Sequence, residues 1–468
     1  MRNTRAAFAT VLLLTALFGS AAASDELLDP AFGNDGVGLV GVLDAVSAPP
    51  VGLAVQADGK LLVCGARPDS PFPPTFLVAR FTAQGIPDLS FGQQGRVEIP
   101  LGATGSRCHG VAVMADGRIV VAGEAWGEPS TMKFGVARLT RDGFLDTTFG
   151  NGTGIVVHGF DSMPVSQALG LVVRADGRIV VAGTTYRGAD LGEMGLLQLT
   201  ADGLPDEGFH GTGEVLADFR SAGYRSSSAL AVALDASGRL VAAGATRSIA
   251  GNTDFAAIRV LPDGRLDPAF GAGGRLVTGF EGNTGQTLET ATAVLLQRDG
   301  KLVLGGVVDR GNSGPNGAGI DMGVARFDAD GNLDASFGDG GKTTVALDLV
   351  ETGTGSHVGA DNLTAMVEDG AGRLVLAGGS QARDGVSSMV ATAVRLLRDG
   401  TLDPAFGVEG KQTYELGLSD EGSQLFTGVA LQGGRLVFGG VGRRGASGGK
   451  DLFVARTFRE TIFAAGFE

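Results

Sequence analysis

Two short apolar runs joined by a tight turn recur along the chain. In the copy at 53–63, LAVQADGKLLV, an apolar stretch is followed by a polar turn that ends at Gly59 and by a second apolar stretch. Apolar runs this short, bounded by Gly and Asp, are typical of strands, and glycine allows the positive φ of a hairpin turn. The pattern predicts hairpins about 60 residues apart, whose turn glycines are Gly59, Gly117, Gly177, Gly238, Gly300, Gly372 and Gly434.

A second repeated pattern follows each hairpin except the last. It consists of a strand that contains an arginine, a glycine turn and a segment of the type Leu/Pro-Asp-x-x-Phe-Gly. One repeat therefore contains four predicted strands, at 51–56, 60–65, 76–82 and 96–101. The phenylalanine of this pattern occurs once before the first hairpin and then after each hairpin except the last, at Phe32, Phe91, Phe149, Phe209, Phe270, Phe337 and Phe406.

Four strands in each repeat, with no helical spacer, predict an all-β fold: a seven-bladed β-propeller of four-stranded antiparallel blades. The last copy has only three strands, and a lone strand at 36–42 precedes the first hairpin. We expect this N-terminal strand to join the last blade (3+1), which closes the ring and removes two open sheet edges. An open array or a different blade count is the alternative. The expected repeats are about 51–101, 110–160, 168–219, 229–280, 290–347, 363–416 and 428–457 plus 25–42.

The N-terminus has the features of an export signal. Arg2 and Arg5 precede an apolar run at 6–18, and small residues ending at Ala23 provide a cleavage site. The run is shorter than the roughly 20 residues of a membrane-spanning helix. We therefore expect export to the periplasm, the cell surface or the medium, with no membrane span after signal removal. The expected organisation is a signal peptide at 1–23, a single propeller domain at 24–457 and a C-terminal tail at 458–468.

The repeat resembles the delta-60 repeat family of exported bacterial proteins. The residues that carry the resemblance are the DGK and DGR turns and the LDPAFG segments at 266–271 and 402–407. The resemblance covers about residues 25–457 and implies an extracytoplasmic repeat protein. The family offers no catalytic motif that could be transferred to this chain.

Composition excludes several classes of protein. The formal net charge is −14, which is unfavourable for binding nucleic-acid phosphates. Two cysteines and four scattered histidines leave little material for a metal site, so we expect no metal, no cofactor and no nucleic-acid partner. Cys64 ends a predicted strand and Cys108 precedes one on the neighbouring blade. In an oxidising compartment they either form a disulfide or remain two free thiols.

Charged residues recur at fixed places in the repeat. The third strand carries an arginine in six copies and Gln198 in another, and an aspartate follows in the connection to the fourth strand. A ring of charges could collect an anionic ligand. We favour a structural role, in which the guanidinium ties this connection to its own blade and the recurring phenylalanine fills the space beneath. The arginines are Arg80, Arg138, Arg259, Arg326, Arg395 and Arg456, and the aspartates are Asp88, Asp146, Asp206, Asp267, Asp334 and Asp403.

One face of the predicted ring is more variable than the other. Alternating strand direction places the hairpin turns on one face and the segments that join second to third strands on the opposite face, where lengths and chemistry differ. Variable loops on a rigid scaffold are where binding sites are commonly built. Trp126, Tyr186 and Tyr224 fall on this face, either as residues that stack on a sugar or dock a protein, or as cover for loop backbone.

No catalytic motif stands out, because the histidines share no spacing with a nucleophile and no phosphate-binding or nucleophile-elbow motif occurs. We therefore expect an exported, non-enzymatic binding or scaffold module, a monomer with a protein or glycan ligand on the variable face. The alternative is a propeller enzyme that acts on extracellular glycans, a hydrolase or lyase. A third possibility is a purely structural surface protein. An enzyme needs converging carboxylates, for which Asp190, Glu193, Asp254 and Asp321 are available.

Overall fold

The structure of the chain is a computed structural model. It describes residues 28–41, 52–67, 73–128, 131–161, 163–188, 191–280, 288–309, 319–347, 349–351, 357–381, 389–418, 423–443 and 450–457. The signal peptide expected at 1–23 and the tail at 458–468 lie outside these residues. Within them, regular structure is β-strand apart from one turn of 3-10 helix at Arg220–Ala222, and no helix is long and apolar enough to cross a membrane.

The strands form antiparallel four-stranded units, each built from strands that are consecutive in the chain. The first unit contains β2 (Gly52–Val55), β3 (Leu61–Arg67), β4 (Thr75–Phe81) and β5 (Arg96–Ile99). Two further units share one eight-stranded sheet, joined by a parallel pair between Met132 and Val165. Its strands are β6 (Gly105–Val113), β7 (Ile119–Gly127), β8 (Thr131–Leu139), β9 (Ile155–His158), β10 (Val165–Val173), β11 (Ile179–Tyr186), β12 (Gly192–Leu199) and β13 (Glu214–Ala217).

Three more four-stranded sheets follow. They contain β14 (Tyr224–Leu234), β15 (Leu240–Ser248), β16 (Thr253–Val260) and β17 (Arg275–Thr278); β18 (Thr290–Leu296), β19 (Leu302–Asp309), β20 (Ile320–Phe327) and β21 (Lys342–Val345); and β24 (Asp361–Glu368), β25 (Leu374–Gln381), β26 (Met389–Leu396) and β27 (Lys411–Tyr414). β22 (Val350–Glu351) and β23 (His357–Val358) form a separate pair that the repeat does not predict.

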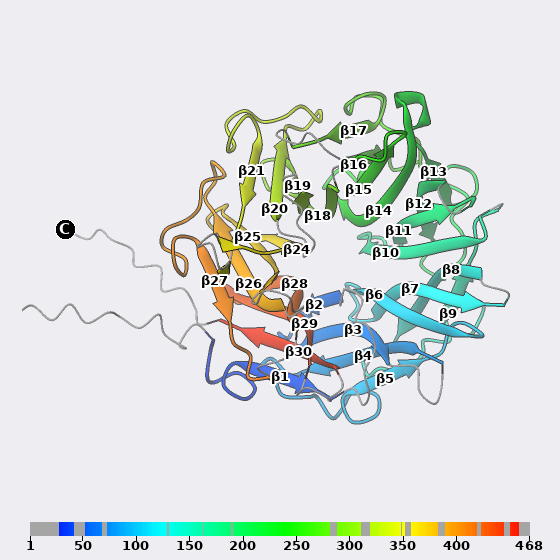
Figure 1. The fold of residues 1–468 in the computed structure, drawn as a ribbon. Coiled ribbons are helices and arrows are strands. Elements are labelled where there is room, and N and C mark those ends of the chain that lie inside the picture. The colour runs from blue at the N-terminus through cyan, green and yellow to red at the C-terminus, as the bar shows by residue number, and fades with distance from the viewer. Residues whose placement is uncertain are drawn as a thin grey trace, which may run out of the picture.

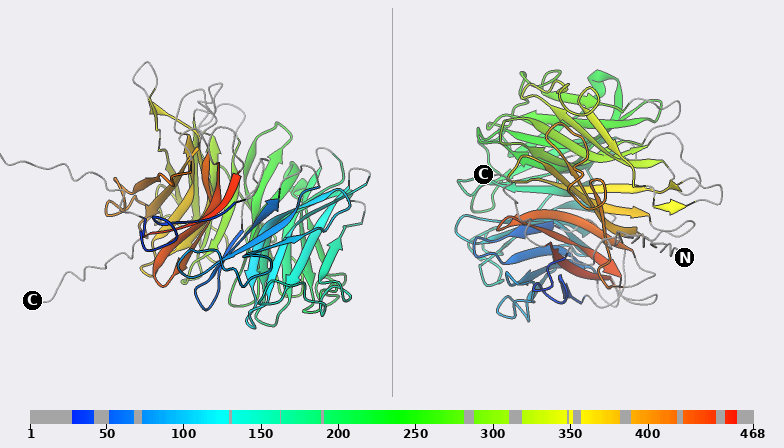
Figure 2. Two further views of the ribbon diagram at one scale, coloured as in Figure 1. Left: turned by 90° about the horizontal axis from the view of Figure 1, so that it is seen from below. Right: turned by 90° about the vertical axis from the view of Figure 1, so that its left-hand side faces the viewer.

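The sheets are arranged around a common centre, with the first strand of each unit innermost and the fourth strand at the outer edge (Figure 1). Seen from the side, neighbouring sheets stand next to one another around the ring (Figure 2). Each sheet therefore has both faces covered by its neighbours, which explains why the second and third strands are almost entirely buried. This is the propeller architecture predicted from the repeat.

The two ends of the described chain meet in one sheet. In order across the sheet, its strands are β1 (Val37–Val40), β30 (Lys450–Arg456), β29 (Arg435–Arg443) and β28 (Gln424–Gln432). β1 runs antiparallel to β30, with Val37 opposite Ala455. The buried carboxylate of Asp29, which precedes β1, accepts hydrogen bonds from Arg435 of β29 and from Arg456 of β30. The expectation that the N-terminal strand joins the three C-terminal strands is confirmed.

The hydrophobic core lies between neighbouring sheets, and small residues let the first strands approach closely. A Cβ atom on Gly52 would lie 3.0 Å from the Cα atom of Gly110, and one on Gly110 would lie 2.9 Å from the Cβ atom of Leu171. Larger side chains at these positions would push the inner strands apart. The small residues that the sequence places in the first strand therefore have a steric role.

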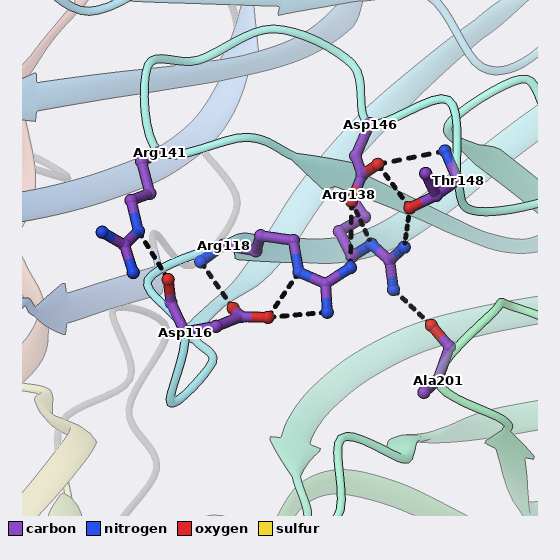
Figure 3. Close-up of polar contacts among 7 residues, drawn as sticks. All are labelled: Asp116, Arg118, Arg138, Arg141, Asp146, Thr148 and Ala201. Carbon is purple, nitrogen blue, oxygen red and sulfur yellow. Dashed lines mark hydrogen bonds and ion pairs between the residues drawn. The ribbon is translucent and has the colours of Figure 1, made fainter.

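A repeated buried ion pair fastens the connection between the third and fourth strands. Arg138 on β8 donates from Nε to Asp146 at 2.8 Å and from Nη2 to Thr148 at 2.8 Å (Figure 3). Its guanidinium lies 4.7 Å from the ring centre of Phe149. Nη1 donates to the carbonyl of Ala201, which belongs to the next unit. The sequence led us to expect a tie within one blade only, so that expectation is corrected: the arginine also joins neighbouring units. The bonds to the aspartate and to the carbonyl of the next unit recur at Arg80, Arg259 and Arg326.

The unit that contains β10–β13 keeps this link with a different set of residues. Gln198 stands at the arginine position and donates to Asp206 at 2.7 Å. Arg174, which follows β10, donates to Gln198 Oε1 at 2.7 Å and to the carbonyl of Gly238 in the next sheet at 2.7 Å. The guanidinium has moved from the third strand to the end of the first strand, and the bond to the next sheet is retained.

The strand directions give the ring two distinct faces. The turn face carries the hairpin turns between first and second strands and the connections from third to fourth strands. The loop face carries the segments between second and third strands and the linkers from each fourth strand to the next sheet. The repeated arginine units lie on the turn face, whereas the residues described next lie on the loop face.

Candidate active site

Two carboxylates from neighbouring sheets meet on the loop face. Glu289, just before β18, is 1% exposed, and Asp254 is the second residue of β16. The backbone of Glu289 is fixed beside β16, because its N–H donates to Oγ1 of Thr253 at 2.8 Å. A Cβ atom on Gly279 would lie 2.9 Å from Asp254 Oδ1 and 3.6 Å from Glu289 Oε2. Because both distances start from the same point, Asp254 Oδ1 and Glu289 Oε2 are no farther apart than the sum of the two distances.

Burial dominates the acid–base properties of Glu289. Together with the charges of Asp254 and Asp309, it raises the pKa of the Glu289 carboxyl to about 7. The N–H of Phe280, which donates to Glu289 Oε2 at 2.9 Å, and the charge of Lys342 act in the opposite direction. A carboxyl with this pKa is partly protonated near neutral pH, so it can donate a proton in a reaction and take one back.

Asp254 has a different environment. Burial raises the pKa of its carboxyl, while a hydrogen bond from Tyr224 lowers it. The Tyr224 hydroxyl donates to Asp254 Oδ2 at 3.4 Å. Burial and the charge of Asp254 raise the pKa of Tyr224, so the hydroxyl keeps its proton and remains a donor. Of the two carboxyls, Asp254 is therefore the one better suited to carry a negative charge.

The position of Glu289 has a structural role in more than one sheet. At this place in the repeat, the side chain accepts a hydrogen bond from the backbone that follows the fourth strand. Asp361 accepts from the N–H of Leu347 at 2.6 Å, and Gln424 accepts from the N–H of Leu416 at 3.1 Å. Glu289 makes the same kind of bond, and in addition it lies close to the carboxylate of Asp254 on β16 of the neighbouring sheet.

Sequence reasoning missed Glu289, because no motif contains it. It stands eleven residues before the hairpin glycine, where three earlier repeats carry Ser106, Ser166 and Ser227. A position-by-position comparison of the repeats could have marked this exchange of a hydroxyl for a carboxyl. It could not have shown that a second carboxyl lies beside it.

Of the four acidic residues proposed from the sequence, Asp254 belongs to this pair. Glu193 is 3% exposed and is bound by Arg220 at 2.7 Å, so its charge is compensated. Asp321 is buried at the beginning of β20. Asp190 lies outside the described residues. Across the parts of the chain that the structure describes, no group of three or more His, Cys, Asp or Glu side chains is placed to hold a metal ion.

The three aromatic residues proposed from the sequence are half-buried. Trp126 donates from Nε1 to Glu124 at 3.0 Å, and the guanidinium of Arg107 lies 4.6 Å from its ring centre. Burial raises the pKa of Tyr186, and the charge of Glu124 adds to this effect, so Trp126 and Tyr186 share one carboxylate neighbour. Tyr224 belongs to the carboxylate pair described above. The structure thus brings each aromatic residue close to an acidic side chain.

The two cysteines are bonded to each other. Cys64 lies within β3 and Cys108 within β6, with 5.8 Å between their Cα atoms. Both lie inside strands and not at the strand ends expected from the sequence, because β3 and β6 extend further along the repeat. The disulfide joins the first sheet to the eight-stranded sheet.

Four segments of the chain match a family model described as "Domain of unknown function (DUF5122) beta-propeller". The matched residues are 115–149, 174–209, 236–270 and 297–337. Each segment begins in a hairpin turn and ends at the recurring phenylalanine of that repeat. These segments are propeller repeats. The comparison with curated proteins gives no match.

Solved structures similar to this propeller include several glycoside-cleaving enzymes. A thermostable family-43 glycoside hydrolase is 11% identical, covers 63% of this chain and 90% of its own, and has a TM-score of 0.35. An alpha-L-arabinofuranosidase from Fusarium graminearum is 9% identical, with 90% and 97% covered and a TM-score of 0.41. An alpha-L-arabinanase from Penicillium chrysogenum is 9% identical, with 89% and 97% covered and a TM-score of 0.41.

The expectation of a non-enzymatic binding or scaffold module is corrected at this point. The three similar structures are enzymes by name, and none of them is named as a binding or scaffold module. At these identities and TM-scores the likeness concerns the fold. An activity can be inferred only from the residues of this chain.

Proposed function

We propose that the protein is a β-propeller glycan hydrolase, and that Glu289 and Asp254 cleave the glycosidic bond. The observation that carries the proposal is the pair of carboxyls on the loop face, one of them with a pKa of about 7. Most glycosidases use two carboxyl groups, about 5–5.5 Å apart in retaining enzymes and about 6.5–9.5 Å apart in inverting ones. The oxygens of Glu289 and Asp254 are less than about 6.5 Å apart, which favours the retaining arrangement.

In the proposed reaction, Glu289 donates its proton to the glycosidic oxygen while Asp254 attacks the anomeric carbon. The bond to the leaving sugar breaks, and a glycosyl ester forms on Asp254. Water then attacks the same carbon, Glu289 takes up the proton of that water, and the ester bond to Asp254 breaks. Each cycle consumes one water and releases two sugar fragments. The hydroxyl of Tyr224 stabilises the anion of Asp254 before attack and after release.

The experiment separates a catalytic Glu289 from a structural one. Glu289→Gln keeps an acceptor for the backbone N–H of Phe280, as Gln424 does at the same place in the last sheet. It removes the proton that the reaction needs. With aryl glycosides of pentoses and hexoses and with arabinan as substrates, we expect kcat to fall at least about a hundredfold, without a decrease in the melting temperature.

Asp361→Asn provides a matched control. This carboxyl occupies the same place in the next sheet, and the proposal expects its substitution to leave kcat unchanged. Asp254→Ala should lose activity and regain turnover when azide is added, because azide can occupy the space of the missing carboxylate and attack the anomeric carbon. Full activity in Glu289→Gln, or no hydrolysis of any substrate by the unmodified protein, would contradict the proposal.

We also propose the domain organisation that the sequence predicts. We count the eight-stranded sheet as two blades, which gives seven blades in one domain at 24–457; the seven hairpin glycines support this count. We also infer a delta-60 type of repeat, export by the signal peptide at 1–23 and a monomeric protein. The mass of the N-terminal peptide of protein recovered from the periplasm or medium tests the cleavage after Ala23.

A further inference from the structure

The third strands of several units carry an acidic residue at one fixed place near the loop face. These residues are Glu193 on β12, Asp254 on β16, Asp321 on β20 and Asp451 on β30. Thr185 of the second strand stands opposite Glu193, and Arg187 follows two residues later. Nε of Arg187 donates to the carboxylate of Glu193 at 3.1 Å, and Arg220 forms a further ion pair at 2.7 Å. The negative charge of Glu193 is therefore compensated.

A serine replaces this arginine beside Asp254. The sequence repeats the arginine in the units of Asp321 and Asp451, as Arg310 and Arg444, both outside the described residues. In the unit of Asp254 the corresponding residue is Ser248. Its Oγ is buried and has no hydrogen-bond partner among the described residues. Of these four acidic residues, only Asp254 has no arginine at this place in the second strand.

No other described side chain supplies the missing charge. The ion pairs of the described residues include none to Asp254 or Glu289. Tyr224 donates to Oδ2 of Asp254 but is uncharged, and no described donor binds Oδ1. Burial and this hydroxyl shift the pKa of Asp254, with no cation among the causes. Arg247 stands next to Thr246, the residue opposite Asp254, so the alternation of β15 directs Arg247 to the other face of the sheet.

Lys342 acts on Glu289 through its charge, but its ammonium group is bonded elsewhere. Nζ of Lys342 donates to the carbonyl of Gly279 at 2.6 Å. Lys411 makes the corresponding bond in the next unit, so this lysine fastens the backbone that follows a fourth strand. The charge of Asp309 acts on Glu289 in the opposite direction. The surroundings of the pair therefore favour a positively charged ligand.

We propose that the site binds an amino sugar, whose ammonium group takes the place of the missing guanidinium beside Asp254. The inference rests on the proposed hydrolase function and specifies its substrate class. When one oxygen of Asp254 attacks the anomeric carbon, the substituent at C2 of the sugar lies near the other oxygen, and glycosidases commonly bind the 2-hydroxyl by hydrogen bonds. An ammonium group at C2 donates a charge-assisted hydrogen bond to this carboxylate. The same negative charge disfavours a uronic acid.

The test is calorimetric titration of the full-length protein with D-glucosamine, just below neutral pH, where the amino group is protonated. D-Glucose is the neutral match, and we expect glucosamine to bind at least about tenfold more tightly. Ser248→Arg gives Asp254 the partner that Arg187 gives Glu193, and should abolish this preference. Arg187→Ser, the reverse exchange in the preceding unit, should leave the preference unchanged.

Equal affinity for glucosamine and glucose, or a preference that Ser248→Arg does not alter, overturns the proposal. If the melting temperature shows that Ser248→Arg does not fold, Asp254→Asn replaces it and should remove the preference in the same way. Hydrolysis is measured separately, with chitosan oligosaccharides beside arabinan. Preferential binding of glucosamine without hydrolysis of either substrate supports the amino-sugar site and contradicts the hydrolase. Hydrolysis of arabinan without a preference for glucosamine supports the hydrolase and overturns the amino-sugar site.

Discussion

The two faces of this ring are built from the same sheets but use their residues differently. On the turn face, one arrangement recurs from unit to unit, as in the bonds of Arg138 to Asp146 and to the following unit. On the loop face, the chemistry changes between sheets, and in one place Asp254 and Glu289 come together. Residues that repeat hold each sheet to its neighbour, whereas residues that depart from the repeat identify where a single sheet can act differently.

A departure from the repeat is informative only when nothing compensates for it. Gln198 replaces the repeated arginine, but Arg174 supplies the guanidinium from another strand and the bond to the next sheet survives. The pair of Asp235 and Ala269 occurs again as Asp369 and Ala405, so it is shared by two sheets and is not a departure of one sheet. An exchange therefore has to be compared across all the repeats before it can mark a site.

The strongest test of the comparison removes a repeated residue of the turn face. Phe270 is 1% exposed, and the guanidinium of Arg259 lies 4.5 Å from its ring centre. Phe270→Ala removes this contact and leaves a void between sheets, so we expect the free energy of unfolding to fall by about 3–5 kcal/mol. Urea denaturation measures the change.

Phe144→Ala is the matched control for that experiment. This phenylalanine lies on the turn face but is 65% exposed, so its removal should change stability by no more than about 0.5 kcal/mol. If both variants unfolded at the same urea concentration, the recurring phenylalanine would have no special role in holding the sheets together.

The second test concerns the covalent link between the first sheet and the eight-stranded sheet. Cys64 and Cys108 are 44 residues apart in sequence, and their bond restricts the unfolded chain. Replacing both by alanine should lower the free energy of unfolding by about 2–4 kcal/mol. Reductant should destabilise the unmodified protein and have no further effect on the double variant. Insensitivity of the unmodified protein to reductant would mean that its thiols are free.

The smallest expected effect is a difference between the two faces in how their buried carboxyls make the free energy of unfolding depend on pH. Burial raises the pKa of Glu289 on the loop face from 4.5 to about 7, so its contribution to stability is complete below pH 4.5 and is lost as the pH rises through about 7. Burial by itself also raises the pKa of Asp146 on the turn face. The bonds from Thr148 and Arg118 and the charge of Arg138 outweigh it and lower the pKa of Asp146 from 3.8 to about 2. The contribution of Asp146 is therefore lost as the pH falls through about 2.

Urea unfolding of the unmodified protein and of Glu289→Gln across this pH range checks the prediction. The variant should gain stability relative to the unmodified protein between about pH 5 and pH 7.5. An Asp146→Asn variant should show its largest deficit near neutral pH, and the deficit should shrink in acid. A difference between Glu289→Gln and the unmodified protein that does not vary with pH would show that Glu289 has an ordinary pKa.

The fold was largely predictable because its determinants are local and repeated. A glycine turn such as Gly59 and a phenylalanine such as Phe91 each specify one part of one repeat, and the missing fourth strand of the last repeat points to the pairing of β1 with β30. The added pair of β22 and β23 was not predictable, because it occurs in a linker that no other repeat shares.

The candidate site was not predictable to the same degree. Asp254 was recognised as an available acid, but Glu289 was not, because only the folded chain shows that Glu289 lies beside Thr253 of β16. Its pKa depends on burial, which no single residue in the sequence reveals. The initial expectation of a protein without activity followed from the lack of a catalytic motif, and the four acidic residues considered for a carboxyl pair did not include Glu289.

The sheet that contains β1 has a consequence for biogenesis. It joins Asp29 to Arg435, which are separated by 406 positions, so this pairing forms only when nearly the whole polypeptide is available. Until then, β1 and β30 each have a backbone edge without a partner, and such edges invite association with other chains. Closure of the ring therefore depends on one pairing, that of β1 with β30. Cutting the chain near either terminus would open the ring and expose the edges of both strands to aggregation.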